Sequence, residues 1–204
     1  MDPERPASAA SPPGRRRVSG EAARGGARDP ASRVGARGAS LRGAGRSPVR
    51  SVLILCLGNP LRRDDAVALH VAARLAARPE PGVEVRTSAQ AGLYLLDDME
   101  GFDRVVVVDA VRTGAAPPGT VHALPLEAIH APGGPSPHAI GLPSAVARAR
   151  AAGAPVPSRI QLVAVEVEIL DEVGEGLTPA VAAAVPAVEA AAREAARALA
   201  DAAG

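Results

Sequence analysis

The sequence predicts an α/β fold: a single three-layer domain in which a mostly parallel, twisted sheet of about five strands has helices on both faces. Continuous apolar runs at 51–57 and 104–109 are typical of strands that are buried on both sides. Helix-like segments alternate with most of the strand-like segments, which is the pattern of parallel strands joined by crossover helices.

The strands are recognised by apolar runs or by alternation. The first is SVLILCL, the second alternates as VEVRT, and the third contains four consecutive valines. The predicted strands span 51–57, 83–87, 104–109, 120–124 and 160–167.

The helices are recognised by apolar spacing and by their starting residues. In the first helix Val67, Val71 and Leu75 recur every four residues, which places them on one face. The last helix begins with Thr178 as N-cap and Pro179 in the first turn, and Pro186 is expected to kink or interrupt it. The predicted helices span 65–77, 92–99, 142–152 and the segment from 178 through the Ala-rich tail.

Residues 1–48 have a different composition from the rest of the chain. They are rich in Gly, Ala, Ser, Pro and Arg and have no apolar periodicity, so we expect a disordered arm ahead of a domain at 49–204. Residues 1–50 hold 11 Arg against 4 acidic residues. The arm is either a passive extension or a tail that binds polyanions.

Charge and composition exclude several classes of protein. Residues 51–204 hold 12 Arg against 18 acidic residues, and the whole chain has one Tyr and one Phe, so we expect no nucleic-acid-binding face. Cys56 is the only cysteine, which excludes an intramolecular disulfide and fits a reducing cytoplasm. The apolar runs are too short to span a bilayer, so we expect no membrane association.

Three sets of polar residues fall at predicted strand ends or in loops before helices, where ligands of α/β proteins bind. They are Asp64 with Asp65, Asp109 and His138. Taken singly, each has a structural explanation: the Asp pair as a helix cap, Asp109 as a loop cap, and His138 as a solvated loop residue. Together, two carboxylates and an imidazole form a three-ligand set for a borderline divalent metal with open positions for substrate.

Other chemistries fit less well. The turn after the first strand has neither G-x-G-x-x-G nor G-K-[ST], and the Asp pair would repel a phosphate. The chain has no G-x-S-x-G nucleophile elbow. Cys56 lies in or at the end of a buried strand, so we interpret it as a packing residue.

Several motifs in the same order resemble the nickel-iron hydrogenase maturation endopeptidases, over nearly all of residues 51–204. The motifs are Gly58-Asn59-Pro60-Leu61-x-x-Asp64-Asp65, Gln90-Ala91-Gly92-Leu93-Tyr94-Leu95-Leu96, Asp109-Ala110, Ser136-Pro137-His138-x-x-Gly141-Leu142 and Gly176-Leu177-Thr178-Pro179.

The resemblance implies a metal-dependent, aspartic-type endopeptidase that removes the C-terminal extension of a hydrogenase large-subunit precursor after nickel has been inserted. It implies that Asp65, Asp109 and His138 contact the nickel, which the precursor supplies, and are the catalytic residues. We place Asn59, Asp64 and Gly92 among the residues that bind substrate. Asp64 either orients Asp65 or acts as a general base, and Gly92 serves either substrate approach or a plain turn.

We further expect a monomer. The competing hypothesis is a non-catalytic α/β binding module, or maturation chaperone, that recognises the metal-loaded precursor without cutting it.

Overall fold

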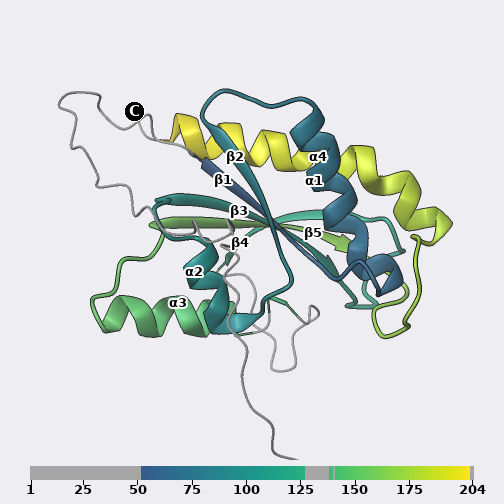
Figure 1. Ribbon diagram of the computed structural model, residues 1–204, viewed down its shortest axis with the longest axis horizontal. Coiled ribbons are helices and arrows are strands. Elements are labelled where there is room, and N and C mark those ends of the chain that lie inside the picture. The colour runs from purple at the N-terminus through teal and green to yellow at the C-terminus, as the bar shows by residue number, and fades with distance from the viewer. Residues whose placement is uncertain (1–51, 127–137, 140, 203–204) are drawn as a thin grey trace, which may run out of the picture. The chain divides into compact units, whose positions relative to one another are not determined.

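Within the described part of the chain, five strands form one sheet in the order β2-β1-β3-β5-β4, which confirms the predicted α/β class (Figure 1). The computed structural model describes residues 52–126, 138–139 and 141–202. The predictions for the arm at 1–48 and for Ser136 and Pro137 lie outside the described residues. All described residues belong to one unit, Gly45–Gly204.

The parallel strands have the apolar composition that burial on both faces requires. Every residue of β1 (Val52–Leu57) and β3 (Arg104–Val111) is buried. The edge strand β2 (Val83–Ser88) is only partly buried. The strands β1, β2, β3 and β5 (Arg159–Glu166) run parallel, while β4 (Val121–Pro125) pairs antiparallel with β5 at the other edge.

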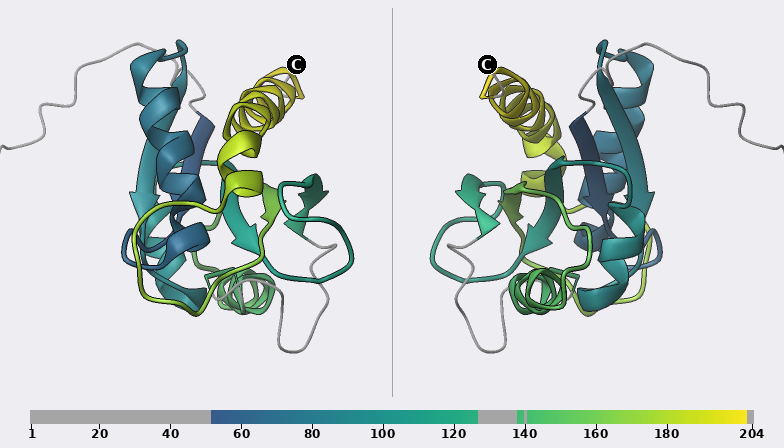
Figure 2. Two further views of the ribbon diagram at one scale, coloured as in Figure 1. Left: turned by 90° about the vertical axis from the view of Figure 1, so that its right-hand side faces the viewer. Right: turned by 90° about the vertical axis from the view of Figure 1, so that its left-hand side faces the viewer.

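Helices cover both faces of this sheet, as predicted (Figures 1 and 2). On one face lie α1 (Val67–Ala77) and α4 (Pro179–Asp201). On the other lie α2 (Leu95–Asp98) and α3 (Leu142–Ala151). Two short 3₁₀ helices, η1 (Arg63–Ala66) and η2 (Gly92–Tyr94), precede α1 and α2. None of the described helices is both long and apolar enough to cross a bilayer.

Alternate residues of the central strands supply two separate cores. Val106, Val108 and Ala110 pack in the core on the α1/α4 face. Val105, Val107 and Val111 pack in the core on the α2/α3 face. Because side chains alternate along a strand, Asp109 points to the α2/α3 face.

Of the two effects predicted for Pro186, the interruption is wrong, because α4 continues through this residue. The kink stays a prediction. Pro186 is exposed, whereas Val181, Val185 and Val188 are buried against the sheet. The apolar stripe thus holds both parts of the helix in place, and the missing amide bond lies on the solvent side.

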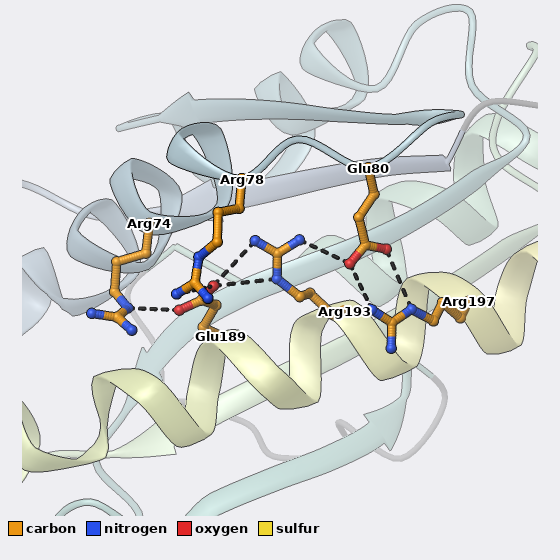
Figure 3. Close-up of polar contacts among 6 residues, drawn as sticks. All are labelled: Arg74, Arg78, Glu80, Glu189, Arg193 and Arg197. Carbon is orange, nitrogen blue, oxygen red and sulfur yellow. Dashed lines mark hydrogen bonds and ion pairs between the residues drawn. The ribbon is translucent and has the colours of Figure 1, made fainter.

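A network of charged side chains joins α1 and the loop after it to α4 (Figure 3). Glu189 accepts hydrogen bonds from Arg74 (2.6 Å) and from Arg193 (3.1 and 3.2 Å). Glu80 accepts from Arg193 and Arg197. Burial raises the pKa of Glu189, but hydrogen bonds from Arg74 and Arg193 outweigh it and hold this pKa below its ordinary value.

Candidate active site

The candidate site lies where the chain changes direction within the sheet. After β1 the chain forms β2 on one side of it and then crosses to β3 on the other side. In open α/β sheets ligands bind beyond the carboxyl ends of the strands at such a point. Asp65 in η1 follows β1, Asp109 lies on β3, and His138 precedes α3.

The turn that positions Asp65 requires a glycine and an unusual backbone conformation. A Cβ atom on Gly58 would overlap the carbonyl oxygen of Asp65. Arg63 has a φ of 34°, in the left-handed region, and its N–H donates to the carbonyl oxygen of Gly174 (2.8 Å). The sequence therefore folds η1 tightly against the end of β1, and this fixes the Asp65 side chain.

The two carboxylate oxygens of Asp65 have different surroundings. Oδ2 accepts hydrogen bonds from the Asn59 amide (2.9 Å) and from Nε2 of His138 (3.2 Å). Oδ1 is buried and has no hydrogen-bond partner among the described residues. The whole residue is only 1% exposed. A buried carboxylate oxygen without a donor is costly in the folded state, so Oδ1 is suited to bind an added group.

The His138 ring lies between two acceptors. Nδ1 lies 3.1 Å from the carbonyl oxygen of Gln90, and Nε2 lies against Asp65. The hydrogen bond to Asp65 raises the pKa of His138; burial opposes this, and the charges of Asp109 and Asp65 add to it. Since both ring nitrogens face oxygen acceptors, the arrangement favours the doubly protonated imidazolium.

Asp109 is fully buried and acts on the site through its charge. The strand β3 was predicted to end at this residue, which is wrong: β3 continues to Val111 because Ala110 and Val111 also pair with β5. Among the described residues, no group of three or more His, Cys, Asp or Glu side chains is arranged to hold a metal ion. Asp65 and His138 therefore form a hydrogen-bonded pair beside the Asp109 charge, and the three-ligand metal set stays a prediction.

Asp64 has a structural role that the sequence did not reveal. It is fully buried, and its oxygens accept hydrogen bonds from the amide (2.6 Å) and hydroxyl (3.0 Å) of Thr178. Thr178 is the N-cap residue of α4, as predicted, but its hydroxyl bonds Asp64 rather than its own helix. These contacts tie η1 to the start of α4, and a contact of Asp64 with substrate stays a prediction.

The other predicted site residues support the pair. Asn59 contributes its main-chain amide to Asp65, while its side-chain oxygen accepts from the Leu61 amide (3.0 Å). Gly92 has a φ of 58°, and its amide donates to the carbonyl oxygen of His138 (3.2 Å). Gly92 thus forms a turn that holds His138. Whether Asn59 or Gly92 also contacts substrate stays a prediction.

Cys56 is confirmed as a packing residue. It is fully buried in β1, and burial raises the pKa of its thiol to about 12. A thiol with this pKa is almost entirely protonated at neutral pH and is a poor nucleophile.

Comparison with known proteins identifies the family. The family model described as hydrogenase maturation protease matches residues 69–195, a range that includes Asp109 and His138. The hydrogenase 2 maturation protease of Escherichia coli is 35% identical over 144 residues, which are 68% of this chain and 86% of that protein.

Solved structures give the same result. The hydrogenase maturating endopeptidase HybD from E. coli superimposes with a TM-score of 0.59 at 31% identity, over 71% of this chain and 93% of that one. The [NiFe] hydrogenase maturation protease HybD from Thermococcus kodakarensis has a TM-score of 0.58 at 26% identity, over 72% of this chain and 99% of that one. The chain therefore belongs to the hydrogenase maturation protease family and is a hydrolase of the endopeptidase class.

Proposed function

We propose that this protein removes the C-terminal extension of a [NiFe]-hydrogenase large-subunit precursor that already carries nickel. Family membership supports the protease activity. The observation that supports the site is the buried Asp65 carboxylate, whose Oδ2 is held by Asn59 and His138 while Oδ1 lacks a hydrogen-bond donor among the described residues.

In this proposal the nickel belongs to the substrate. A carboxylate oxygen and an imidazole nitrogen are donors that suit a borderline divalent ion, and Asp65 and His138 already lie side by side. To bind the ion, His138 must release the proton on Nε2 that faces Asp65. Asp109 adds negative charge next to the pair, which favours a cation there.

We assign two roles to Asp65, Asp109 and His138: they recognise the nickel and place the scissile peptide bond. The site is then of the aspartic type and depends on the metal. Hydrolysis consumes one water molecule and leaves a new carboxylate on the large subunit and a new amino group on the released peptide. Because a precursor without nickel lacks the group that these residues bind, cleavage follows metal insertion.

Incubating the purified protein with nickel-loaded and nickel-free precursor tests this function. We expect the intact mass of the nickel-loaded precursor to fall by the mass of one C-terminal peptide, with the nickel-free precursor unchanged. Formation of a complex without release of a peptide would favour the chaperone hypothesis and overturn the proposal.

We also infer that the protein is a cytoplasmic monomer. The location is supported by the single buried cysteine, which fits a reducing compartment. Sedimentation of the purified protein tests whether it is a monomer.

A further inference from the structure

Large apolar side chains that stay exposed are concentrated around the candidate site. Among the described residues five such side chains are exposed, and four of them lie on the segments that hold Asp65 and His138. Their exposed fractions are 59% for Leu61, 62% for Leu93, 67% for Tyr94 and 86% for Val173. The fifth, Leu124, is 40% exposed and lies on β4 at the edge of the sheet.

Leu61 and Val173 lie on the Asp65 side of the site. The carbonyl oxygen of Leu61 accepts a hydrogen bond from the Gly174 amide (2.9 Å), which brings Val173 next to Leu61. The Leu61 amide donates to the side chain of Asn59, whose own amide bonds Asp65. This pair of apolar side chains is therefore tied to the turn that positions Asp65.

Leu93 and Tyr94 lie on the His138 side. They belong to η2, in which no residue is buried. Gly92, directly before them, donates its amide to the carbonyl oxygen of His138, and Gln90 accepts from the His138 ring. The segment that carries these two side chains therefore holds His138 in place.

Charged side chains near Val173 already pair within the protein. Glu172 lies 4.0 Å from Arg63, and Asp171 accepts a 2.6 Å hydrogen bond from Arg112. Exposed apolar side chains that gather at one place mark an interaction site, because covering them gains hydrophobic free energy. Aromatic side chains such as Tyr94 contribute strongly to such contacts.

We propose that Leu61, Val173, Leu93 and Tyr94, here called the apolar rim, bind apolar side chains of the precursor segment that is held at Asp65 and His138. This inference rests on the proposed function. A chain whose peptide bond is held at Asp65 and His138 must continue over the segments that hold those residues, and these segments carry the rim.

Two double variants test the rim: Leu61→Ser with Val173→Ser, and Leu93→Ser with Tyr94→Ser. Leu124→Ser is the matched control, because it removes an exposed apolar side chain far along the sheet from β1. KM and kcat for precursor cleavage and the Kd of the precursor are measured for each protein. We expect each double variant to raise KM and Kd by about tenfold or more, with kcat within about twofold of the wild type and no effect of Leu124→Ser.

Because KM and Kd are measured separately, the two proposals fail in different ways. Unchanged KM and Kd in both double variants would overturn the rim while leaving the cleavage activity intact. Loss of precursor binding in the double variants, with no cleavage by the wild type, would support the rim and overturn the proposed function. A wild type that dimerises in sedimentation, with double variants that are monomers, would show that a second copy covers these residues and would also overturn the rim.

Discussion

At the scale of single residues, the Asp65–His138 pair explains how the site is held before substrate arrives. Each His138 ring nitrogen faces an oxygen, and the Asp65 oxygen that it contacts also accepts the Asn59 amide. One oxygen of Asp65 is therefore used to fix its orientation, and the other lies buried without a donor among the described residues. In one carboxylate, Oδ2 thus has the structural role, and Oδ1 is the oxygen suited to bind an added group.

The raised pKa of His138 predicts a pH dependence of stability. A group whose pKa is higher in the folded state stabilises the protein below its unfolded pKa, about 6.5 for His, and this stabilisation is lost as pH rises through the folded value. We expect the free energy of unfolding of the wild type to fall relative to that of His138→Gln as pH rises above about 6.5, the ordinary pKa of histidine. Urea unfolding of both proteins across this range measures it. A difference between them that does not change with pH would contradict the raised pKa of His138.

The sequence singled out the acidic and histidine residues of the candidate site, but it did not predict their hydrogen-bond partners. Asp65, Asp109 and His138 were recognisable because each lies in a family motif and at a predicted strand end or loop. The bonds from Thr178 to Asp64 could not be predicted, since the two residues are 114 positions apart. The contact between the His138 ring and the carbonyl oxygen of Gln90 could not be predicted either, because every residue has a main-chain carbonyl oxygen.

At the scale of elements, α4 contains a proline where a helix loses stability. Pro186 lies inside the helix, has no N–H to donate and is exposed. We expect Pro186→Ala to raise the free energy of unfolding by about 1–2 kcal/mol, because alanine restores the missing bond. The greater freedom of the unfolded alanine chain offsets part of the gain.

Pro179→Ala is the matched control for this prediction. Pro179 occupies the first turn of the same helix, where proline is tolerated, so its replacement is expected to change the stability little. Urea unfolding of the two variants and the wild type makes the comparison. A Pro186→Ala protein no more stable than Pro179→Ala would contradict our account of α4.

The elements themselves were largely predictable, because the buried strands are apolar throughout and the helices have a regular apolar stripe. The strand β1 lies at 52–57 against a predicted 51–57, and α3 at 142–151 against 142–152. The continuity of α4 was not predictable from local preference, since the core residues against which the helix packs on both sides of Pro186 come from distant parts of the chain.

At the scale of the whole molecule, the charged network of Figure 3 joins α1 to α4 across the outside of the sheet. Glu189 is its least exposed carboxylate, with a side chain 7% exposed beside Arg193 at 15%. We expect Glu189→Gln to lower the free energy of unfolding by about 1–2 kcal/mol at neutral pH, because charge-assisted hydrogen bonds become neutral ones.

The pH dependence of this effect follows from the lowered pKa of Glu189. The ionised Glu189 carboxylate stabilises the folded protein fully above the pKa of an unfolded glutamate, about 4.3. This stabilisation is lost as pH falls through the lower pKa of the folded state. The difference between wild type and Glu189→Gln should therefore shrink in acid. Arg78→Ala is the control: its side chain is 71% exposed and 3.7 Å from Glu189, so we expect a change below about 0.5 kcal/mol. Equal losses of unfolding free energy in Glu189→Gln and Arg78→Ala would contradict our account that the buried Glu189 carboxylate contributes most to the network.

The fold as a whole brings the site together from three distant parts of the chain. Because β1 and β3 are neighbours in the sheet, η1 lies beside β3. The hydrogen bond between His138 and Asp65 brings the start of α3 to the same place. The Asp64–Thr178 bonds attach the start of α4 to the same place. A substitution that loosens these connections should therefore affect activity as well as stability.

The most direct test is the intact mass of the nickel-loaded precursor after incubation with Asp65→Asn, Asp109→Asn or His138→Ala. These variants should melt cooperatively, as the wild type does, and should leave the precursor at full length, while the wild type shortens it by one C-terminal peptide. Normal shortening by all three variants would contradict the assignment of these residues to the active site.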